Sequence, residues 1–299
     1  MKITLTGSLG RIGTPLTQKL LEERHTITVI SSNLARSQKI ETLGAIPAIG
    51  RLQDTDFLAA SFQDANAVYV MIPPANYFDH NLNLLEYFQE LGNSFAQAIV
   101  QTKVKRVVNM SSIGAHLEKG NGILEGTHFV EQTLNNLPED VAITHVRPTE
   151  IYYNLFQFIN LIKNQGIMAS NLAEGDCNAW VSPQDIADVV VEELAKSGSG
   201  RDVRYVASDE LTYREVASTL GSAIGKPDLP WVKITDEQLK ESLKGAGMKP
   251  EIAEGMVEMY AAIRSGLLYE DYKLHQPKIL GQVKMKDFAK EFATVYNQQ

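Results

Sequence analysis

The stretch TLTGSLGRIGTPLTQKLL, residues 4 to 21, carries three glycines at intervals of three, directly after an apolar run. The residues that lead into it, Ile3 to Thr6, are typical of a β-strand. After the turn, Ile12, Leu16 and Leu20 fall on one helical face. Glycines let a backbone approach an anion closely, and a helix N-terminus offers it free N–H groups. The stretch therefore predicts a strand, a tight turn and a helix that hold the pyrophosphate of a dinucleotide.

A plain turn between a strand and a helix is the alternative explanation, because short glycine spacings are common in a chain with 21 glycines. The complete context of strand, turn and helix favours the dinucleotide site. The residues of the turn that we expect to contact this cofactor are Thr6, Gly7, Leu9, Gly10, Arg11, Ile12 and Gly13.

The end of the second predicted strand favours NADP(H) over NAD(H). An NAD site usually has an Asp or Glu about 20 residues after the glycine turn, but no acidic residue lies between Glu23 and Glu41. Hydroxyl, amide and guanidinium groups can instead bind a 2′-phosphate. We expect these contacts from Ser31, Ser32, Asn33 and Arg36, with Arg11 as a second cation. The alternative role of Arg36 is a solvated charge on a helix surface.

Short β-type runs alternate with segments of helical spacing through the first half of the chain. The runs are 25–31, 45–50, 66–72, 105–111 and 141–147. This alternation predicts an α/β fold, a doubly wound parallel sheet of the Rossmann type with helices on both faces. Such folds bind ligands at the carboxyl ends of the strands, where the strand order reverses.

The pattern changes beyond residue 150. Residues 149–166 read as an aromatic-rich helix, and 180–196 carry a helix start signal, with Ser182 as N-cap and Pro183 in the first turn. Helix capping is the expected role of Asp185, three residues after the cap.

The 299 residues are enough for one large domain or two modest ones. The run 201–208 is typical of a further strand that can join the sheet. We therefore expect a Rossmann domain of residues 1–150, to which 181–208 returns. The expected smaller lobe on the substrate side is mainly helical and comprises 151–180 and 209–299.

Composition excludes several classes of function. A net charge of −8 with dispersed Lys and Arg argues against a nucleic-acid partner. The single cysteine, Cys177, excludes an intramolecular disulfide, and the six histidines form no H-x-x-H or H-E-x-x-H pair, so we expect no metal site. Without a signal peptide or spanning apolar stretch, we expect a cytoplasmic protein with no membrane partner. Its expected partner is a small molecule, and its expected state is a monomer or a homodimer.

Six stretches are informative when taken together. They are TGSLGRIG (6–13), ANAVYVMIPP (65–74), VKRVVNMSSIGAH (104–116), HVRPTEIYYNLF (145–156), WVSPQDIADVVV (180–191) and LTYREVASTLGSAIGKP (211–227). With them the chain resembles the NmrA-like group of atypical short-chain dehydrogenases/reductases. The resemblance implies an extended Rossmann domain with NAD(P) in the glycine cleft and a small carboxy-terminal lobe. It adds the cofactor contacts Ile72, Pro73, Pro74, Ser111, Ser112 and Pro148.

The chain departs from the ketone-reducing members of that superfamily. Those enzymes use a Tyr-x-x-x-Lys pair, in which Tyr protonates the alkoxide. Between Ser111 and Leu134 this chain has no tyrosine, and its one lysine there, Lys119, lies in a polar stretch. His128, near the family's lysine position, and Tyr152 are the candidate catalytic residues, although a lone helix histidine is commonly structural.

The missing acid constrains the acceptor. Hydride addition turns a ketone into a strongly basic alkoxide, whereas a quinone becomes a weakly basic phenolate that can take its proton from water. Flat aromatic side chains suit the walls of a site for such an acceptor. Ordinary helix packing is an alternative explanation for part of the aromatic spacing in residues 149–166. The residues expected to line the substrate pocket are Tyr77, His80, Thr149, Tyr152, Tyr153 and Asn154. The segment 255–268 has apolar residues at helical spacing and is a candidate for closing that pocket.

Two functions follow from the resemblance, which includes reductases of quinones and azo compounds as well as sensors that bind the cofactor without turnover. The favoured hypothesis is an NADPH-dependent oxidoreductase that transfers a hydride to a quinone-like or other conjugated acceptor. The alternative is a non-catalytic NADP(H)-binding sensor that acts through a protein partner.

Overall fold

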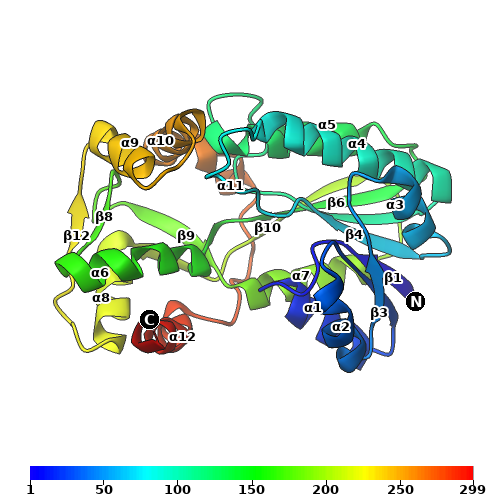
Figure 1. The fold of residues 1–299 in the computed structure, drawn as a ribbon, viewed down its shortest axis with the longest axis horizontal. Coiled ribbons are helices and arrows are strands. Elements are labelled where there is room, and N and C mark those ends of the chain that lie inside the picture. Colours follow the sequence, from blue (N-terminus) through cyan, green and yellow to red (C-terminus); the bar gives the residue numbers. More distant parts are fainter. Residues whose placement is uncertain (299) are drawn as a thin grey trace.

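A seven-stranded sheet, in which every pairing is parallel, forms the centre of the computed structural model, which describes residues 1–298 (Figure 1). Its strand order is β10-β6-β5-β4-β1-β2-β3. The strands are β1 (Lys2–Leu5), β2 (Thr26–Ser31), β3 (Ile46–Ile49), β4 (Ala67–Met71), β5 (Arg106–Met110), β6 (Ala142–Pro148) and β10 (Arg201–Val206). The expected α/β class with a doubly wound parallel sheet is confirmed.

Helices cover both faces of this sheet, as crossover connections between parallel strands require. One face carries α1 (Gly13–Glu22), α2 (Ser37–Leu43) and α7 (Pro183–Ala195), whose apolar side chains share a core with the sheet. The other face carries α3 (Thr55–Phe62), α4 (Leu84–Thr102) and α5 (Glu125–Asn135). The helical positions Leu16 and Leu20 are buried on α1, as their spacing predicts.

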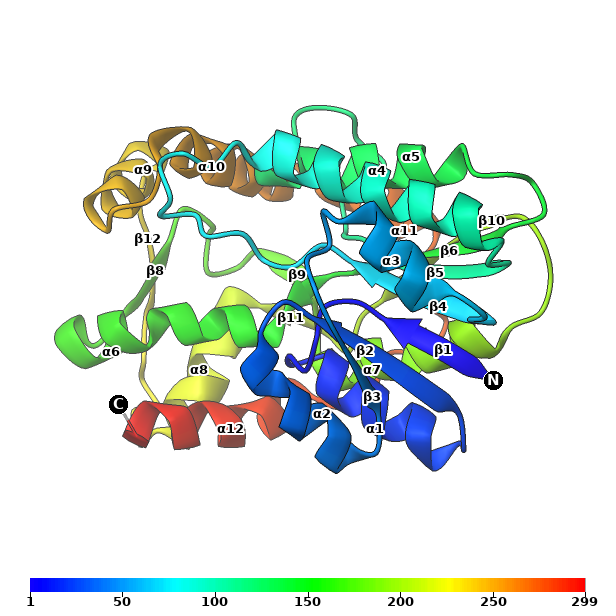
Figure 2. The same cartoon turned by 45° about the vertical axis from the view of Figure 1, so that its right-hand side comes forward.

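A C-terminal lobe lies at the carboxyl ends of the strands (Figure 1). Its strands are β7 (Glu150–Ile151), β8 (Met168–Ser170), β9 (Cys177–Val181), β11 (Asp209–Thr212) and β12 (Trp231–Lys233). Its helices are α6 (Ile159–Gln165), α8 (Tyr213–Ala223), α9 (Asp236–Gly245), α10 (Pro250–Ser265), α11 (Glu270–Leu274) and α12 (Met285–Gln298). Figure 2 shows α12 beside α8, against which it packs. We retain the division into 1–150 with 181–208, and 151–180 with 209–299, as a proposal.

The segment 149–166 is not the continuous helix that its aromatic spacing predicts. It forms the short strand β7, a 3-10 helix (Tyr152–Phe158) and then α6. The 3-10 helix has three residues per turn, so it places Tyr152 and Leu155 on one side, where both are buried. Three other short 3-10 helices occur at Leu34–Arg36, Gly122–Leu124 and Leu267–Tyr269.

The start of α7 confirms one expectation and corrects another. Ser182 caps the helix by accepting a hydrogen bond from the N–H of Gln184 at 3.1 Å. Capping is the wrong role for Asp185, because its buried carboxylate accepts hydrogen bonds from the hydroxyl of Ser208 at 2.5 Å and from two N–H groups near α12. Asp185 therefore fastens the segment before the C-terminal helix to the Rossmann sheet.

Within residues 1–298, no helix combines the length and the apolar character needed to cross a membrane. The same residues contain no group of three or more His, Cys, Asp or Glu side chains placed to hold a metal ion.

Candidate active site

The strand order reverses between β1 and β4, and the glycine turn follows β1 at that point. The hydroxyl of Thr6 accepts a hydrogen bond from the N–H of Met71 at 2.8 Å and donates one to its carbonyl at 3.3 Å. Thr6 thus joins the carboxyl ends of β1 and β4, and its buried hydroxyl is committed to this bridge. A crevice at such a reversal is where open α/β sheets bind ligands.

The three glycines of the turn serve different purposes. Gly7 has a φ of +83°, and a Cβ there would lie 2.5 Å from the Cε of Met71. A Cβ on Gly13 would overlap the carbonyl of Ser8. A Cβ on Gly10 would meet nothing closer than the Gly7 carbonyl oxygen at 4.0 Å. The chain itself requires the outer two glycines, whereas Gly10 leaves open space beside the helix N-terminus, and this fits a bound pyrophosphate.

Leu9 and Ile12, also predicted to contact the cofactor, are only 6% and 7% exposed and lie in the core beneath the turn. They anchor the turn through apolar packing. Contact of the turn with a bound dinucleotide is therefore left to its backbone.

The second cofactor region lies beside the turn. The guanidinium of Arg36 is within 3.3 Å of the Ser8 hydroxyl and 3.2 Å of the Leu9 carbonyl, to both of which it donates. Ser31 is buried, and its hydroxyl accepts a hydrogen bond from the N–H of Asn33. Ser32 and Asn33 are exposed next to them, so the structure brings the predicted 2′-phosphate residues together.

Arg11 points to a different partner. It forms an ion pair with Glu291 on α12, and its guanidinium carbon lies 5.1 Å from the centre of the Phe156 ring.

A cavity of about 750 Å³ lies between the glycine turn, the start of α7 and α12. It is lined by Leu9, Gly10, Arg11, Thr14, Pro15, Gln18, Lys39, Tyr153, Ser182, Pro183, Gln184, Val283, Asp287, Phe288 and Glu291.

Two of the predicted substrate residues, Tyr77 and Tyr153, are partly buried, and Tyr77 packs against the start of α10. Burial and the proximity of Tyr153 raise the pKa of Tyr77, and burial raises the pKa of Tyr153 while Arg11 opposes the shift. The fully buried Tyr69 on β4 also lies near Tyr153, and burial raises its pKa. Its hydroxyl has no hydrogen-bond partner in the described part of the chain, and nothing in the sequence singled it out.

The structure does not place all predicted substrate residues at a surface. Tyr152 is only 1% exposed, and its hydroxyl donates to Asp209 at 2.8 Å, so its expected catalytic and substrate roles are corrected to a core role. Thr149 is also buried, and its hydroxyl donates to the Val206 carbonyl. Asn154 is exposed at the 3-10 helix.

The remaining predicted residues lie in loops, at strand ends and, for His128, in helix α5. A ring nitrogen of the exposed His80 is 3.3 Å from the carbonyl of Gly247, just before α10. Nδ1 of the partly buried His128 is 2.9 Å from the Ala115 carbonyl. This contact fixes the orientation of the ring, which is typical of a histidine with a structural role. Ile72, Pro73, Pro74, Ser112 and Pro148 follow or end strands β4, β5 and β6 at their carboxyl ends.

Ser111 belongs to a buried polar network that sequence reasoning missed. Its hydroxyl donates to Glu131 at 2.5 Å, and Arg147 binds both carboxylate oxygens of Glu131, at 2.9 and 2.6 Å. Arg147 also binds Asp271 of α11 at 2.8 Å. Burial opposes ionisation of Glu131, but the hydrogen bonds from Arg147 hold its pKa below the usual range. The network links the sheet to the C-terminal lobe. The Ser111 hydroxyl donates its proton within this network.

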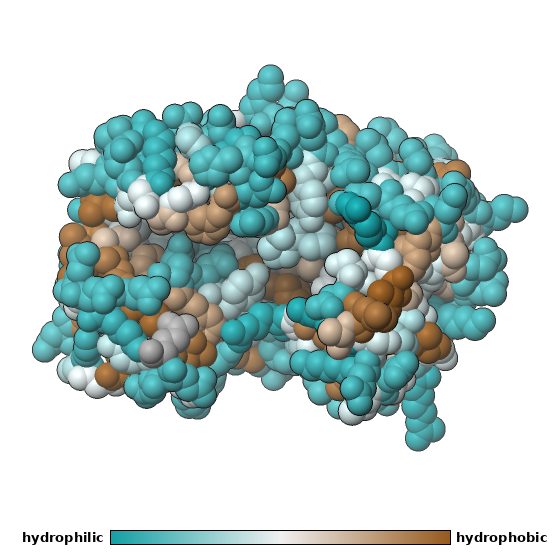
Figure 3. Space-filling view, in the orientation of Figure 1, coloured by the Kyte–Doolittle hydropathy of each residue, from teal (hydrophilic) through white to brown (hydrophobic). Residues whose placement is uncertain are grey.

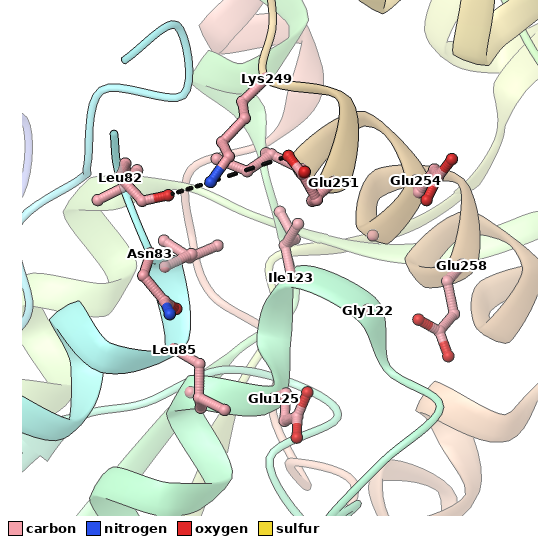
Figure 4. A pocket seen from close by; sticks show the side chains of 14 residues that line it. Leu82, Asn83, Leu85, Gly122, Ile123, Glu125, Lys249, Glu251, Glu254 and Glu258 are labelled. Carbon is pink, nitrogen blue, oxygen red and sulfur yellow. Dashed lines mark hydrogen bonds and ion pairs between the residues drawn. The ribbon is translucent and has the colours of Figure 1, made fainter. Parts of the chain in front are cut away.

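A second cavity of about 500 Å³ lies between the starts of α4 and α5 and the helix α10 (Figure 4). Glutamates surround it, and Lys249 spans one side by donating to the carbonyl of Leu82 at 2.9 Å, near Glu251. In the orientation of Figure 1, the space-filling view shows a hollow between the upper and lower parts of the molecule, with polar and apolar side chains along its walls (Figure 3). None of the predicted cofactor residues lines the glutamate-rich cavity.

The sequence profile of the NmrA-like family matches residues 1–288. The chain belongs to the NmrA-like family. A curated relative of this NmrA-like protein is the NAD(P)H azoreductase of Xenophilus azovorans, which is 27% identical over 264 residues, covering 87% of this chain and 86% of the relative.

Solved structures of similar fold include two named reductases. The NADPH-dependent quinone oxidoreductase of Escherichia coli, solved with NADPH, has a TM-score of 0.78 and 17% identity, covering 97% of this NmrA-like chain and 99% of the other. The triphenylmethane reductase of Citrobacter sp. has a TM-score of 0.75 and 17% identity, covering 98% and 100% of the two chains. At this identity the structures establish the shared fold.

Proposed function

We propose that this NmrA-like protein is an NADPH-dependent reductase that transfers a hydride to a quinone-like or other conjugated acceptor, such as an azo compound. The observation that carries the proposal is the open space at Gly10, at the reversal of strand order. The names of the azoreductase and quinone oxidoreductase relatives support an NAD(P)H-dependent reductase. The acceptor class and the preference for NADPH over NADH are part of our proposal.

The residues that would hold the cofactor divide by region. The backbone around Gly10 and the N-terminus of α1 would hold the pyrophosphate, and Ser32, Asn33 and Arg36 would hold the 2′-phosphate. The bound dihydronicotinamide supplies a hydride, which is two electrons and one hydrogen nucleus. Tyr77 and Tyr153 would position the flat acceptor. We do not include Tyr152 and Thr149 in the proposed pocket, because their side chains form hydrogen bonds within the core.

Arg36→Ala tests the cofactor preference. A charge-assisted hydrogen bond contributes about 1.5–3 kcal/mol, so we expect NADPH affinity to fall by about 10- to 100-fold. NADH lacks the 2′-phosphate, and its affinity is expected to stay close to that of the unmodified protein. Fluorescence titration with both nucleotides measures this, and equal losses for the two would show that Arg36 does not read the phosphate.

The acceptor class is tested by loss of NADPH absorbance with a panel of quinones, azo dyes and simple ketones. We expect turnover with quinones or similar electron-poor π systems and none with unactivated ketones, because the chain has no Tyr-x-x-x-Lys pair. Efficient reduction of an unactivated ketone would contradict the proposed acceptor class and would require an acid that donates to an alkoxide.

A further inference from the structure

The C-terminal helix α12 contacts the glycine turn through Glu291. The carboxylate of Glu291 forms an ion pair with the guanidinium of Arg11, the residue that follows Gly10 in the turn. The side chains of Arg11 and Glu291 are 50% and 49% exposed. Both line the cavity of about 750 Å³ beside the turn, together with Gly10. The ion pair therefore joins α12 to the place where we propose that the pyrophosphate binds.

Other contacts fix α12 to the lobe. The ring centres of Phe288 and Phe292 lie 5.2 and 5.8 Å from that of Phe156, and Phe292 is fully buried. At the start of the helix, the N–H of Met285 donates to the carboxylate of Asp209 at 2.6 Å. The helix can therefore stay packed on the lobe while the ion pair to the glycine turn opens.

A bound pyrophosphate offers Arg11 a second partner. An exposed ion pair contributes little, because water screens both charges and two flexible side chains must be held in one geometry. A pyrophosphate carries more charge than a carboxylate, and a guanidinium can bind two of its oxygens at once. These differences favour transfer of Arg11 from Glu291 to the phosphate.

Two other charged side chains line the cavity, Lys39 on α2 and Asp287 at the start of α12. Asp287 forms its ion pair within the helix, with Lys290 at 2.9 Å. Of the two acidic side chains in the cavity wall, Glu291 is therefore the one that competes with a phosphate for Arg11.

On the basis of the proposed cofactor site, we propose that Glu291 competes with the cofactor for Arg11, so that binding of NADP(H) transfers Arg11 from α12 to the pyrophosphate. Glu291 thereby lowers the affinity for the cofactor, and binding of the cofactor releases α12 from the glycine turn. The coupling is reciprocal, because two partners that exclude each other weaken each other equally. Since α12 forms one wall of the cavity, occupation of the cofactor site changes the hold on that wall.

Fluorescence titration with NADPH tests the competition. Arg11→Met removes the shared cation, and we expect the Kd to rise about 10- to 100-fold. Glu291→Gln removes the competing charge and keeps the shape of the side chain, so we expect the Kd to fall about 2- to 5-fold, as for an exposed ion pair. In the Arg11→Met background, Glu291→Gln is expected to have no effect, because the side chain for which it competes is absent.

Glu174→Gln is the matched control. Glu174 is also 49% exposed and forms an ion pair with an arginine, Arg214, but it does not line the cavity beside the turn. E174Q removes the same charge as E291Q, and we expect it to bind NADPH with unchanged affinity. A general effect of lost negative charge would instead tighten binding in E174Q, and it would persist in the R11M background.

Heteronuclear NMR of the arginine side chains gives a readout that involves no turnover. The Nε–H signal of Arg11 is identified by its absence from R11M. Without nucleotide, we expect this signal to differ between the unmodified protein and E291Q, because Glu291 binds the guanidinium in the former. With saturating NADP+, we expect the same signal from both proteins, since Arg11 then has the same phosphate partner.

Unchanged or weaker NADPH binding by E291Q would overturn the competition, and so would unchanged binding by R11M. An Arg11 signal that still depends on Glu291 at saturating NADP+ would also overturn it, because the ion pair would then persist in the complex. If the unmodified protein does not bind NADPH, the proposed function fails together with this inference. The titration of the unmodified protein thus separates failure of the competition from failure of the proposed function.

Discussion

Gly10→Val is expected to abolish NADP(H) binding while the protein stays folded. A valine side chain at this position would enter the open space beside the N-terminus of α1, where the nearest protein atom to a Cβ is 4.0 Å away. It would therefore displace the pyrophosphate without colliding with the chain. Loss of the backbone contacts to a charged group predicts a rise in Kd of about 100-fold or more. Fluorescence titration with NADPH measures the change.

Gly175→Val is the matched control, since a Cβ there would also meet nothing within 4 Å and the residue is exposed in the C-terminal lobe. We expect this variant to bind NADPH normally. Circular dichroism and thermal unfolding establish that both variants are folded. Unchanged NADPH affinity in the Gly10 variant would contradict the placement of the cofactor at the glycine turn.

Arg147→Met is expected to lower the free energy of unfolding by about 3–5 kcal/mol, because it leaves a buried carboxylate without its cation. Arg147 and Glu131 have side chains that are 7% and 3% exposed, and two hydrogen bonds join them. Urea unfolding at neutral pH measures the loss. A change within a few tenths of a kcal/mol would mean that the contacts of Arg147 with Glu131 and Asp271 do not stabilise the fold.

The pH dependence of this loss has a definite sign. In the unmodified protein the pKa of Glu131 is lowered, so its contribution to stability is present above its ordinary pKa of 4.5 and is lost as the pH falls through the lowered value. Without Arg147, burial, the largest influence on Glu131, is opposed only by His145 and the hydroxyl of Ser111, so we expect the pKa of Glu131 to rise. We therefore expect the deficit of Arg147→Met to shrink as the pH is lowered. The double variant with Glu131→Met should recover much of the lost stability, since no buried charge remains.

The sequence predicted what depends on local order along the chain. The glycine turn, the alternating strands and helices and the cap at Ser182 are set by neighbouring residues, and each is found in the structure. The short strands of the lobe, such as β8 and β12, were not predicted. They are three residues long and pair across about 60 residues of chain, so no local pattern marks them.

The candidate site was predictable only in part, because side-chain partners come from distant segments. The aromatic stripe suggested that Tyr152 faces a substrate, but a 3-10 helix and the bond to Asp209 turn it into the core. Asp185 binds N–H groups nearly 100 residues away, at Gln282 and Val283. The carboxylate of Glu150 likewise accepts hydrogen bonds from β9, α8 and the segment after α10, which no spacing in the sequence brings together.

The most direct test of the central claim, that the protein is an NADPH-dependent reductase, is an anaerobic titration of NADPH absorbance with a quinone. We predict that the unmodified protein oxidises NADPH in equimolar amount with the quinone, and that Gly10→Val does so no faster than a blank without protein. NADPH binding by the unmodified protein without oxidation by any quinone or azo dye would contradict the claim and favour a cofactor-binding sensor.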